Sequence, residues 1–148
     1  MENKSLSVLA KELEEFRQTW GSGMPFPPPC FTSMQGKFLE YQSRKSLKVS
    51  FPVLGEGLNP QNKMQGGFLT AAFDNVFGPL SYLAARSPCT TLDIQTQFFR
   101  GIDDHETITI TAEVIARGSN SIYMTADAFN SIGKLVAKSN TNLLIVKL

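Results

Sequence analysis

An α+β fold, in which one antiparallel sheet wraps over one central helix, is predicted by the sequence. Residues 66–85 form a long, mostly apolar segment rich in Ala, Leu and Phe, which is typical of a buried helix. β-rich segments flank it, two before and four after, and turn residues separate them. There is no strand-helix-strand alternation and no internal repeat. We therefore expect a single domain, residues 1–148, with a sheet of five to six strands.

An additional helix is expected at the N-terminus. Apolar side chains recur there every three or four residues, at Leu6, Leu9, Leu13, Phe16 and Trp20. Gly21-Ser22-Gly23 should end this helix, and residues 25–29, Pro-Phe-Pro-Pro-Pro, should form an extended connector because proline disfavours helix interiors and sheet ladders. Residues 1–30 are thus expected to be helix and connector, and residues 31–148 the core of the fold.

The expected strands follow from runs of β-branched and aromatic residues. Before the long helix they are residues 38–41 and 47–53, joined near Ser43-Arg44. After it they are residues 90–99, 107–116, 121–129 and 134–146. Because these four strands are consecutive and separated by short turns, we expect them to form an antiparallel meander.

Composition excludes several functions. The formal net charge is +1, with 14 Lys and Arg against 13 Asp and Glu, so a nucleic-acid partner is not expected. A single histidine, His105, and two cysteines without metal-ligand spacing argue against a metal site. The polar N-terminus and the lack of a long uncharged apolar run predict a cytoplasmic protein without a membrane partner.

Asp74 is the only charged residue within segment 66–85. Two interpretations remain open at this point. Asp74 can belong to a polar stripe with Thr70, Asn75 and Ser81 and bond a neighbouring strand. Alternatively, it is a desolvated carboxylate that acts as a general base.

Gly66-Gly67, at the start of the same segment, offers a second chemical group. Unobstructed N–H groups at a helix N-terminus suit an oxyanion or a polarised carbonyl, although glycines also permit close packing. Asp74 lies eight residues further on, about 12 Å along a helix, which is too far for both groups to reach one carbon atom. Two copies with antiparallel helices would bring them together, so a homodimer is expected.

These residues resemble the hotdog-fold acyl-CoA thioesterases, in particular the PaaI-like group of the 4-hydroxybenzoyl-CoA thioesterase superfamily. The resemblance covers residues 59–148. It rests on the loop Asn-Pro-Gln-Asn-Lys-Met-Gln-Gly-Gly, residues 59–67, and on Asp74 nine positions after Gln65. The family usually has Gly where this chain has Asn62, which tolerates the left-handed backbone region. It usually has His where this chain has Gln65.

The resemblance implies a hotdog fold and hydrolysis of an acyl-CoA to a carboxylate and free CoA. Asp74 would be the base, Thr91 would help hold the water, and Gly66 with Gln65 would polarise the carbonyl. The implied substrate contacts are Asn59, Gly67, Phe68, Phe73, Phe77, Arg100, Arg117 and the proline-rich segment. The chain's 11 phenylalanines favour an aromatic or medium-chain acyl group. The resemblance also implies no resident cofactor and a homodimer assembled into a dimer of dimers.

Two alternatives accompany this interpretation. Gln65 can donate an N–H group but cannot carry a proton, so a non-catalytic acyl-CoA-binding or interaction module is the first alternative. A hydratase or dehydratase is the second and weaker one, because His105 lies in the turn of residues 101–106, away from the proposed site.

Overall fold

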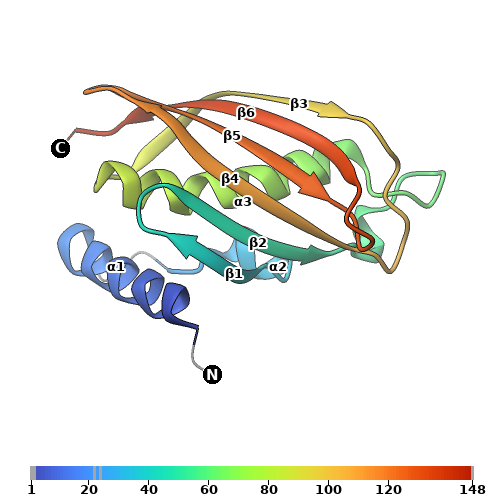
Figure 1. The fold of residues 1–148 in the computed structure, drawn as a ribbon, viewed down its shortest axis with the longest axis horizontal. Coiled ribbons are helices and arrows are strands. Elements are labelled where there is room, and N and C mark those ends of the chain that lie inside the picture. The colour runs from blue at the N-terminus through green and yellow to red at the C-terminus, as the bar shows by residue number, and fades with distance from the viewer. Residues whose placement is uncertain (1–2, 22, 24, 148) are drawn as a thin grey trace.

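The computed structural model describes residues 3–21, 23 and 25–147 (Figure 1). Its elements are α1 (Lys4–Trp20), α2 (Pro29–Ser33), β1 (Lys37–Gln42), β2 (Ser46–Pro52), the short 3-10 helix η1 (Gly55–Gly57), α3 (Gly66–Ala85), β3 (Cys89–Phe98), β4 (Thr107–Arg117), β5 (Ser121–Phe129) and β6 (Leu135–Ile145). Ser22, part of the predicted helix-ending segment, lies outside the described residues. Within those residues, no helix has the length and apolar character needed to cross a membrane.

The predicted architecture, a sheet wrapped around a central helix, is confirmed. The sheet has six strands in the order β1-β2-β4-β5-β6-β3, and every neighbouring pair is antiparallel. The meander prediction holds for β4, β5 and β6 but is wrong for β3, which pairs with β6 at the edge of the sheet. This edge position lets the sheet curl around α3, so that β3 contacts the helix that precedes it in the chain.

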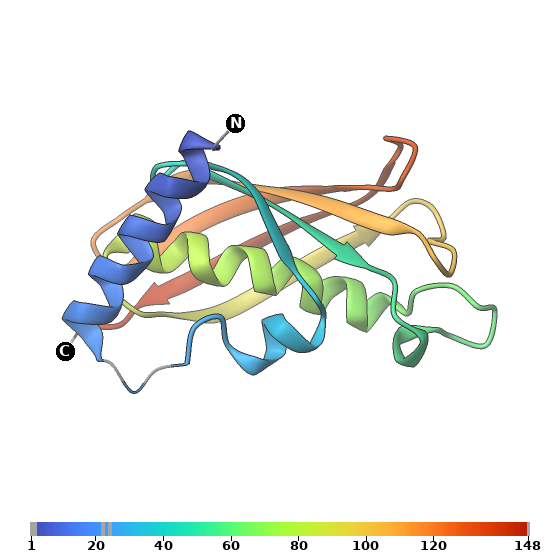
Figure 2. The same ribbon diagram turned by 90° about the horizontal axis from the view of Figure 1, so that it is seen from below.

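Helix α3 forms the centre of the core and runs along the sheet (Figure 2). It begins and ends at the predicted residues, 66 and 85. Gln65 caps its first turn, and Arg86 adopts a left-handed backbone with φ 54° before Ser87-Pro88, which cannot continue a helix. Phe73 and Phe77 are fully buried, and each contributes about 1.5–3 kcal/mol by leaving water.

Helix α1 covers the β1 edge of the sheet. The Asn3 side chain donates to the Leu39 carbonyl oxygen over 3.1 Å, and the Tyr41 N–H donates to the Ser5 hydroxyl over 3.2 Å. The Glu12 carboxylate also accepts a 2.8 Å hydrogen bond from the Tyr41 hydroxyl. Backbone groups of one sheet edge are thereby bonded by side chains of the same chain.

The proline-rich connector is shorter than predicted. Residues 25–28 are irregular, but Pro29 is the first residue of helix α2. Proline is accepted at this position because the first N–H of a helix has no partner within the helix. Helix α2 then packs beside α3, and its Phe31 joins the core.

Candidate active site

Asp74 and Thr91 form the centre of the candidate site. Asp74 lies midway along α3, and Thr91 lies on β3, which runs beside the helix. The Thr91 hydroxyl donates a 3.1 Å hydrogen bond to Oδ1 of Asp74. This contact brings together two residues that the sequence analysis had linked through resemblance alone, and it holds one carboxylate oxygen in place.

A cavity of about 350 Å³ adjoins this pair. We call it the Asp74 cavity. Asp74 and Thr91 are on its wall, and the remaining wall is mostly apolar, including Pro25, Phe26, Pro28, Pro79, Tyr82 and Leu143. A mostly apolar hollow with a few polar groups is the usual form of a small-molecule site. Residues of the proline-rich segment thus line the cavity beside Asp74.

Tyr82 belongs to this wall although the sequence analysis did not select it. A signal was present, because Asp74, Gly78 and Tyr82 recur at intervals of four and therefore share one face of α3. Burial raises the pKa of the Tyr82 phenol, and electrostatic interactions with Cys89 and Asp74 raise it further. Tyr82 therefore remains a neutral phenol at neutral pH.

One face of α3 is uncovered in the single chain. Gly67, Ala71 and Asp74 are exposed and Gly78 is partly exposed, at the spacing of one helical stripe. The expectation of a carboxylate desolvated inside the core is therefore wrong for the chain alone, because Asp74 points away from that core. The side chains beside it are small, so another surface can approach closely.

The start of α3 carries free donors. The Gln65 side chain caps the helix, because its Oε1 accepts a 3.1 Å hydrogen bond from the Phe68 N–H. This cap leaves the Gln65 Nε2 as a donor. No described residue accepts a hydrogen bond from the N–H of Gly66 or Gly67. Three donors therefore gather at the positive end of the helix dipole.

Asn59 shapes the loop before α3 through its side-chain oxygen, which accepts two hydrogen bonds from the loop backbone. Its Oδ1 accepts hydrogen bonds from the N–H groups of Gln61, at 2.9 Å, and Lys63, at 3.0 Å. Asn62 has φ 59°, the left-handed conformation expected for the residue that replaces the family's glycine. The loop thus fixes where Gln65 and Gly66 lie, and the substrate contact expected of Asn59 stays a prediction.

Phe73 and Phe77 do not line the Asp74 cavity. Both are fully buried in the core of the chain, where their rings stack with centroids 6.3 Å apart. Phe68 is exposed but lines a different cavity, next to Met34 and Met64. The predicted substrate contacts of Phe73 and Phe77 are therefore wrong, because α3 turns these rings toward the sheet and away from Asp74.

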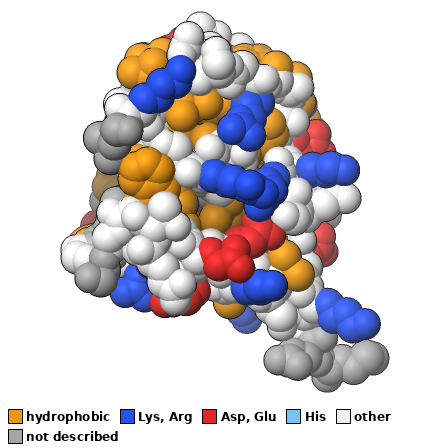
Figure 3. Space-filling view, turned by 90° about the vertical axis from the view of Figure 1, so that its left-hand side faces the viewer, with side chains coloured by type: hydrophobic (Ala, Val, Ile, Leu, Met, Phe, Trp, Pro, Cys, Tyr) orange, Lys and Arg blue, Asp and Glu red, His pale blue; other side chains and the backbone are white. Residues whose placement is uncertain are grey.

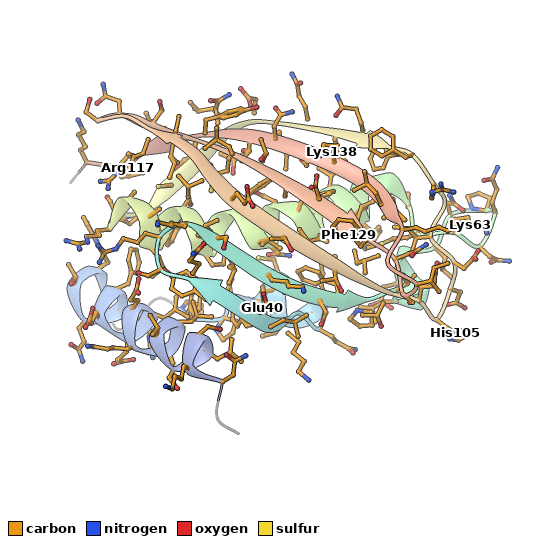
Figure 4. The ribbon with its side chains drawn as sticks, viewed as in Figure 1. Glu40, Lys63, His105, Arg117, Phe129 and Lys138 are labelled. Carbon is orange, nitrogen blue, oxygen red and sulfur yellow. The ribbon has the colours of Figure 1, made fainter. Side chains whose placement is uncertain are left out.

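Arg100 and Arg117, two of the implied substrate contacts, lie at opposite ends of the molecule. Arg100 lines a cavity of about 390 Å³ beside Gly66, at the start of α3. Arg117 donates to the Ala85 carbonyl oxygen over 3.4 Å, at the end of α3. Figure 4 shows Arg117 far from Lys63 and His105. Figure 3, which faces the end of the molecule near Arg117, shows Lys and Arg side chains gathered there.

His105 is a solvent-exposed turn residue, as predicted. Its side chain is 92 % exposed and lies 3.3 Å from the Asp104 carboxylate. Among the described residues, no cluster of three or more His, Cys, Asp or Glu side chains has the arrangement of a metal site.

The model of the thioesterase superfamily matches residues 62–137, so the chain belongs to this superfamily. The matched region includes α3, Asp74 and Thr91. This membership identifies the chain as a thioester hydrolase by class. No curated protein matches the sequence closely enough to count as a relative.

Solved structures show the same hotdog fold. The PaaI protein of E. coli, from the phenylacetic acid degradation operon, has a TM-score of 0.80 at 16% identity, over 94% of this chain and 96% of that one. A mutant of the phenylacetic acid degradation protein PaaI from Thermus thermophilus has a TM-score of 0.73 at 21% identity, over 80% and 99%. A Streptococcus mutans protein bound to acetyl CoA has a TM-score of 0.71 at 16% identity, over 75% and 88%.

Proposed function

We propose that this chain hydrolyses acyl-CoA thioesters at sites formed between two copies of itself. The observation that carries the proposal is the Asp74–Thr91 pair, a carboxylate held by a hydroxyl on the wall of an apolar cavity. Superfamily membership gives the reaction class, and the acyl-CoA substrate is inferred from neighbours of the same fold. One such neighbour is bound to acetyl CoA, and a Streptococcus pneumoniae hypothetical thioesterase contains coenzyme A.

The arrangement of groups supports general-base chemistry. Asp74 accepts a proton from a water molecule, with Thr91 orienting the carboxylate, and the water oxygen forms a bond to the thioester carbon. The N–H of Gly66 and the Nε2 of Gln65 stabilise the negative charge that develops on the thioester oxygen. The carbon–sulfur bond then breaks, and the proton on Asp74 passes to the CoA sulfur. The products are a carboxylate and free CoA.

A second copy is needed because the Asp74 carboxylate and the N–H donors at the start of α3 are too far apart in one chain. Eight residues separate Gly66 from Asp74 on α3, about 12 Å along the axis. In a two-fold pair with antiparallel helices, the start of one α3 lies near the middle of the other. The uncovered stripe of Gly67, Ala71 and Gly78 would permit that approach.

The two edges of the sheet support the same pairing. The side chains of Asn3, which caps α1, and of Ser5 in α1 bond backbone groups of the β1 edge, whereas β3 has no further strand on its outer side among the described residues. Leu92 and Phe98, both on β3, are more than half exposed. Strand β3 is thus suited to pair with its own copy, and such a pair would bring Arg117 of one copy toward the Arg100 end of the other.

Turnover of an acyl-CoA panel, followed by detection of the released thiol, tests the proposal. The panel should include phenylacetyl-CoA, benzoyl-CoA and straight-chain acyl-CoAs from acetyl to dodecanoyl. At least one should be hydrolysed at a rate that Asp74→Asn lowers by about 10²–10⁴-fold, the usual contribution of a general base. The variant should keep the oligomeric state of the parent in size-exclusion chromatography.

Two results would contradict this function. Binding of acyl-CoA without turnover of any member of the panel would favour the non-catalytic module, since Gln65 cannot carry a proton. Turnover that is equal in the parent and in Asp74→Asn would remove Asp74 from the mechanism.

A further inference from the structure

Phe26 and Tyr82 stand between two cavities. Both residues line the Asp74 cavity, and both also line a second, smaller cavity beneath α1. We call this second space the α1 cavity; its other walls include Leu13, Phe16 and Trp20. The two rings therefore form a partition, with the carboxylate on one side and apolar space on the other.

The partition lies at a defined distance from Asp74. Tyr82 is eight residues beyond Asp74 on the same face of α3, which is about 12 Å along the helix. An acyl chain whose thioester carbon is next to Asp74 and which extends along α3 meets Tyr82 and Phe26 at this distance. The cavity is about 350 Å³ on the Asp74 side of these rings.

Contacts with the rest of the chain hold the Tyr82 ring and the segment that follows Phe26. Tyr82 stacks on Phe16 of α1, with ring centroids 5.2 Å apart. The connector that carries Phe26 is anchored to α3 through Cys30, whose carbonyl oxygen accepts a 3.1 Å hydrogen bond from Asn75 Nδ2. The Cys30 thiol also donates to Asn75 Oδ1 over 3.3 Å. Phe26 and Tyr82 therefore separate the Asp74 cavity from the space beneath α1.

We infer that Phe26, backed by Tyr82, sets the maximum length of the acyl group that the enzyme accepts. This inference rests on the proposed acyl-CoA hydrolysis and adds a residue that determines specificity. Straight-chain acyl groups that end before the partition bind fully in the Asp74 cavity. Longer ones have to displace the Phe26 ring, and they lose binding at the reacting geometry. Removal of the Phe26 ring lengthens the acyl pocket by the space of the ring itself, because the α1 cavity behind it has a volume of only about 10 Å³.

The experiment compares kcat/KM for hexanoyl-CoA and dodecanoyl-CoA in Phe26→Ala, Phe26→Trp and the parent. Phe26→Ala should raise the ratio of dodecanoyl to hexanoyl turnover by about tenfold or more, since an apolar pocket discriminates single methylene groups by factors of about 10–200. Phe26→Trp should lower the same ratio, because a larger ring shortens the pocket. Ile132→Ala, in the turn between β5 and β6 and 74 % exposed, is the matched control and should keep the parent's ratio.

The possible outcomes separate the inference from the proposed function. Opposite shifts in the alanine and tryptophan variants support the inference. Hydrolysis by the parent with an unchanged ratio in both variants overturns the inference and leaves the function intact. An absence of hydrolysis of every acyl-CoA by the parent overturns both. Thermal unfolding of each variant shows whether a changed ratio comes from a folded enzyme.

Discussion

The Thr91 hydroxyl on β3 donates a 3.1 Å hydrogen bond to the Asp74 carboxylate on α3. The bond joins the central helix to the edge strand of the sheet, and it leaves the other carboxylate oxygen, Oδ2, available to a water molecule. Both residues are on the wall of the same cavity. The position of the edge strand and the orientation of the Asp74 carboxylate are consequently linked.

Removing the Thr91 hydroxyl should slow turnover without unfolding the protein. Thr91→Val keeps the shape of the side chain but loses its hydrogen bond to a charged group, which is worth about 1.5–3 kcal/mol. We expect kcat to fall by roughly tenfold or more, with little change in KM. The control is Thr96→Val on the same strand, whose hydroxyl bonds Thr70 and Ser139 and not Asp74. Equal effects of the two substitutions would contradict a specific role for Thr91.

Gln65→Glu should separate the two roles of Gln65. A carboxylate can still accept the Phe68 N–H at the start of α3, and its charge suits the helix dipole, so thermal stability should be maintained. The variant lacks the amide donor, however, and kcat should fall by about 10²-fold, the usual cost of losing one oxyanion donor. Unfolding temperature and kcat are both measured. Unimpaired kcat would mean that Gln65 serves only as a helix cap.

Mixing two impaired variants should restore activity if each site combines two chains. Asp74→Asn and Gln65→Glu damage different halves of the site, so a mixed dimer has one intact site and one doubly damaged site. Equal amounts, unfolded and refolded together, should recover roughly a quarter of the parent's activity, because half of the dimers are mixed and each has one working site. Activity no greater than the average of the separate variants would argue for sites within single chains.

Asn75→Ala should destabilise the fold. Asn75 is 9 % exposed and bonds both the carbonyl oxygen and the thiol of Cys30. Its loss removes both hydrogen bonds to Cys30, each worth about 0.5–1.5 kcal/mol, so the free energy of unfolding should fall by about 1–3 kcal/mol in urea titrations. Asn140→Ala is a suitable control, because the Asn140 side chain makes no hydrogen bond to a described residue. A change as large in the control would show that the Cys30 contact is not the cause.

Stability should decline at high pH through Tyr41. Burial, with a smaller contribution from Glu12, raises the pKa of Tyr41 to about 12 in the folded chain. The phenol of the unfolded chain titrates near its ordinary value of about 10, so the unfolded state binds fewer protons above that pH. The Tyr41 contribution is complete below about pH 10 and is lost as the pH rises toward 12. Unfolding in urea across this range should show a steeper decline for the parent than for Tyr41→Phe, and identical slopes would contradict the assignment.

The sequence predicts where the helices and strands begin and end better than it predicts which of them lie side by side. The bounds of α3 follow from local signals, namely Gln65 and the glycines at its start and Ser87-Pro88 after its end. The place of β3 beside β6 could not be predicted, because alternating side chains indicate a strand but not its partner. Helix α2 was missed because the three prolines at residues 27–29 suggested an extended chain, although proline is well accepted at a helix start.

The candidate site was predictable only where it depends on residues that are close together in the sequence. The spacing of Gln65, Gly66 and Asp74 is local and visible in the sequence. Phe73 and Phe77 were misplaced because α3 is apolar on most of its circumference, so composition does not show which ring meets the sheet. The partition at Phe26 depends on packing between residues far apart in the chain, and no local pattern predicts it.

The bare outer side of β3 also has a consequence for handling and production of the protein. No strand among the described residues pairs with the outer side of β3, where Leu92 and Phe98 are exposed. Such an edge is a template for any extended peptide, including unfinished or misfolded copies of the same chain. Slow or dilute synthesis would prolong the time that each new polypeptide spends with this side unshielded. The yield of soluble protein should therefore depend on how rapidly each folded chain meets a second folded copy. Charged substitutions along β3 would reduce aggregation, but they would also prevent the two copies from pairing.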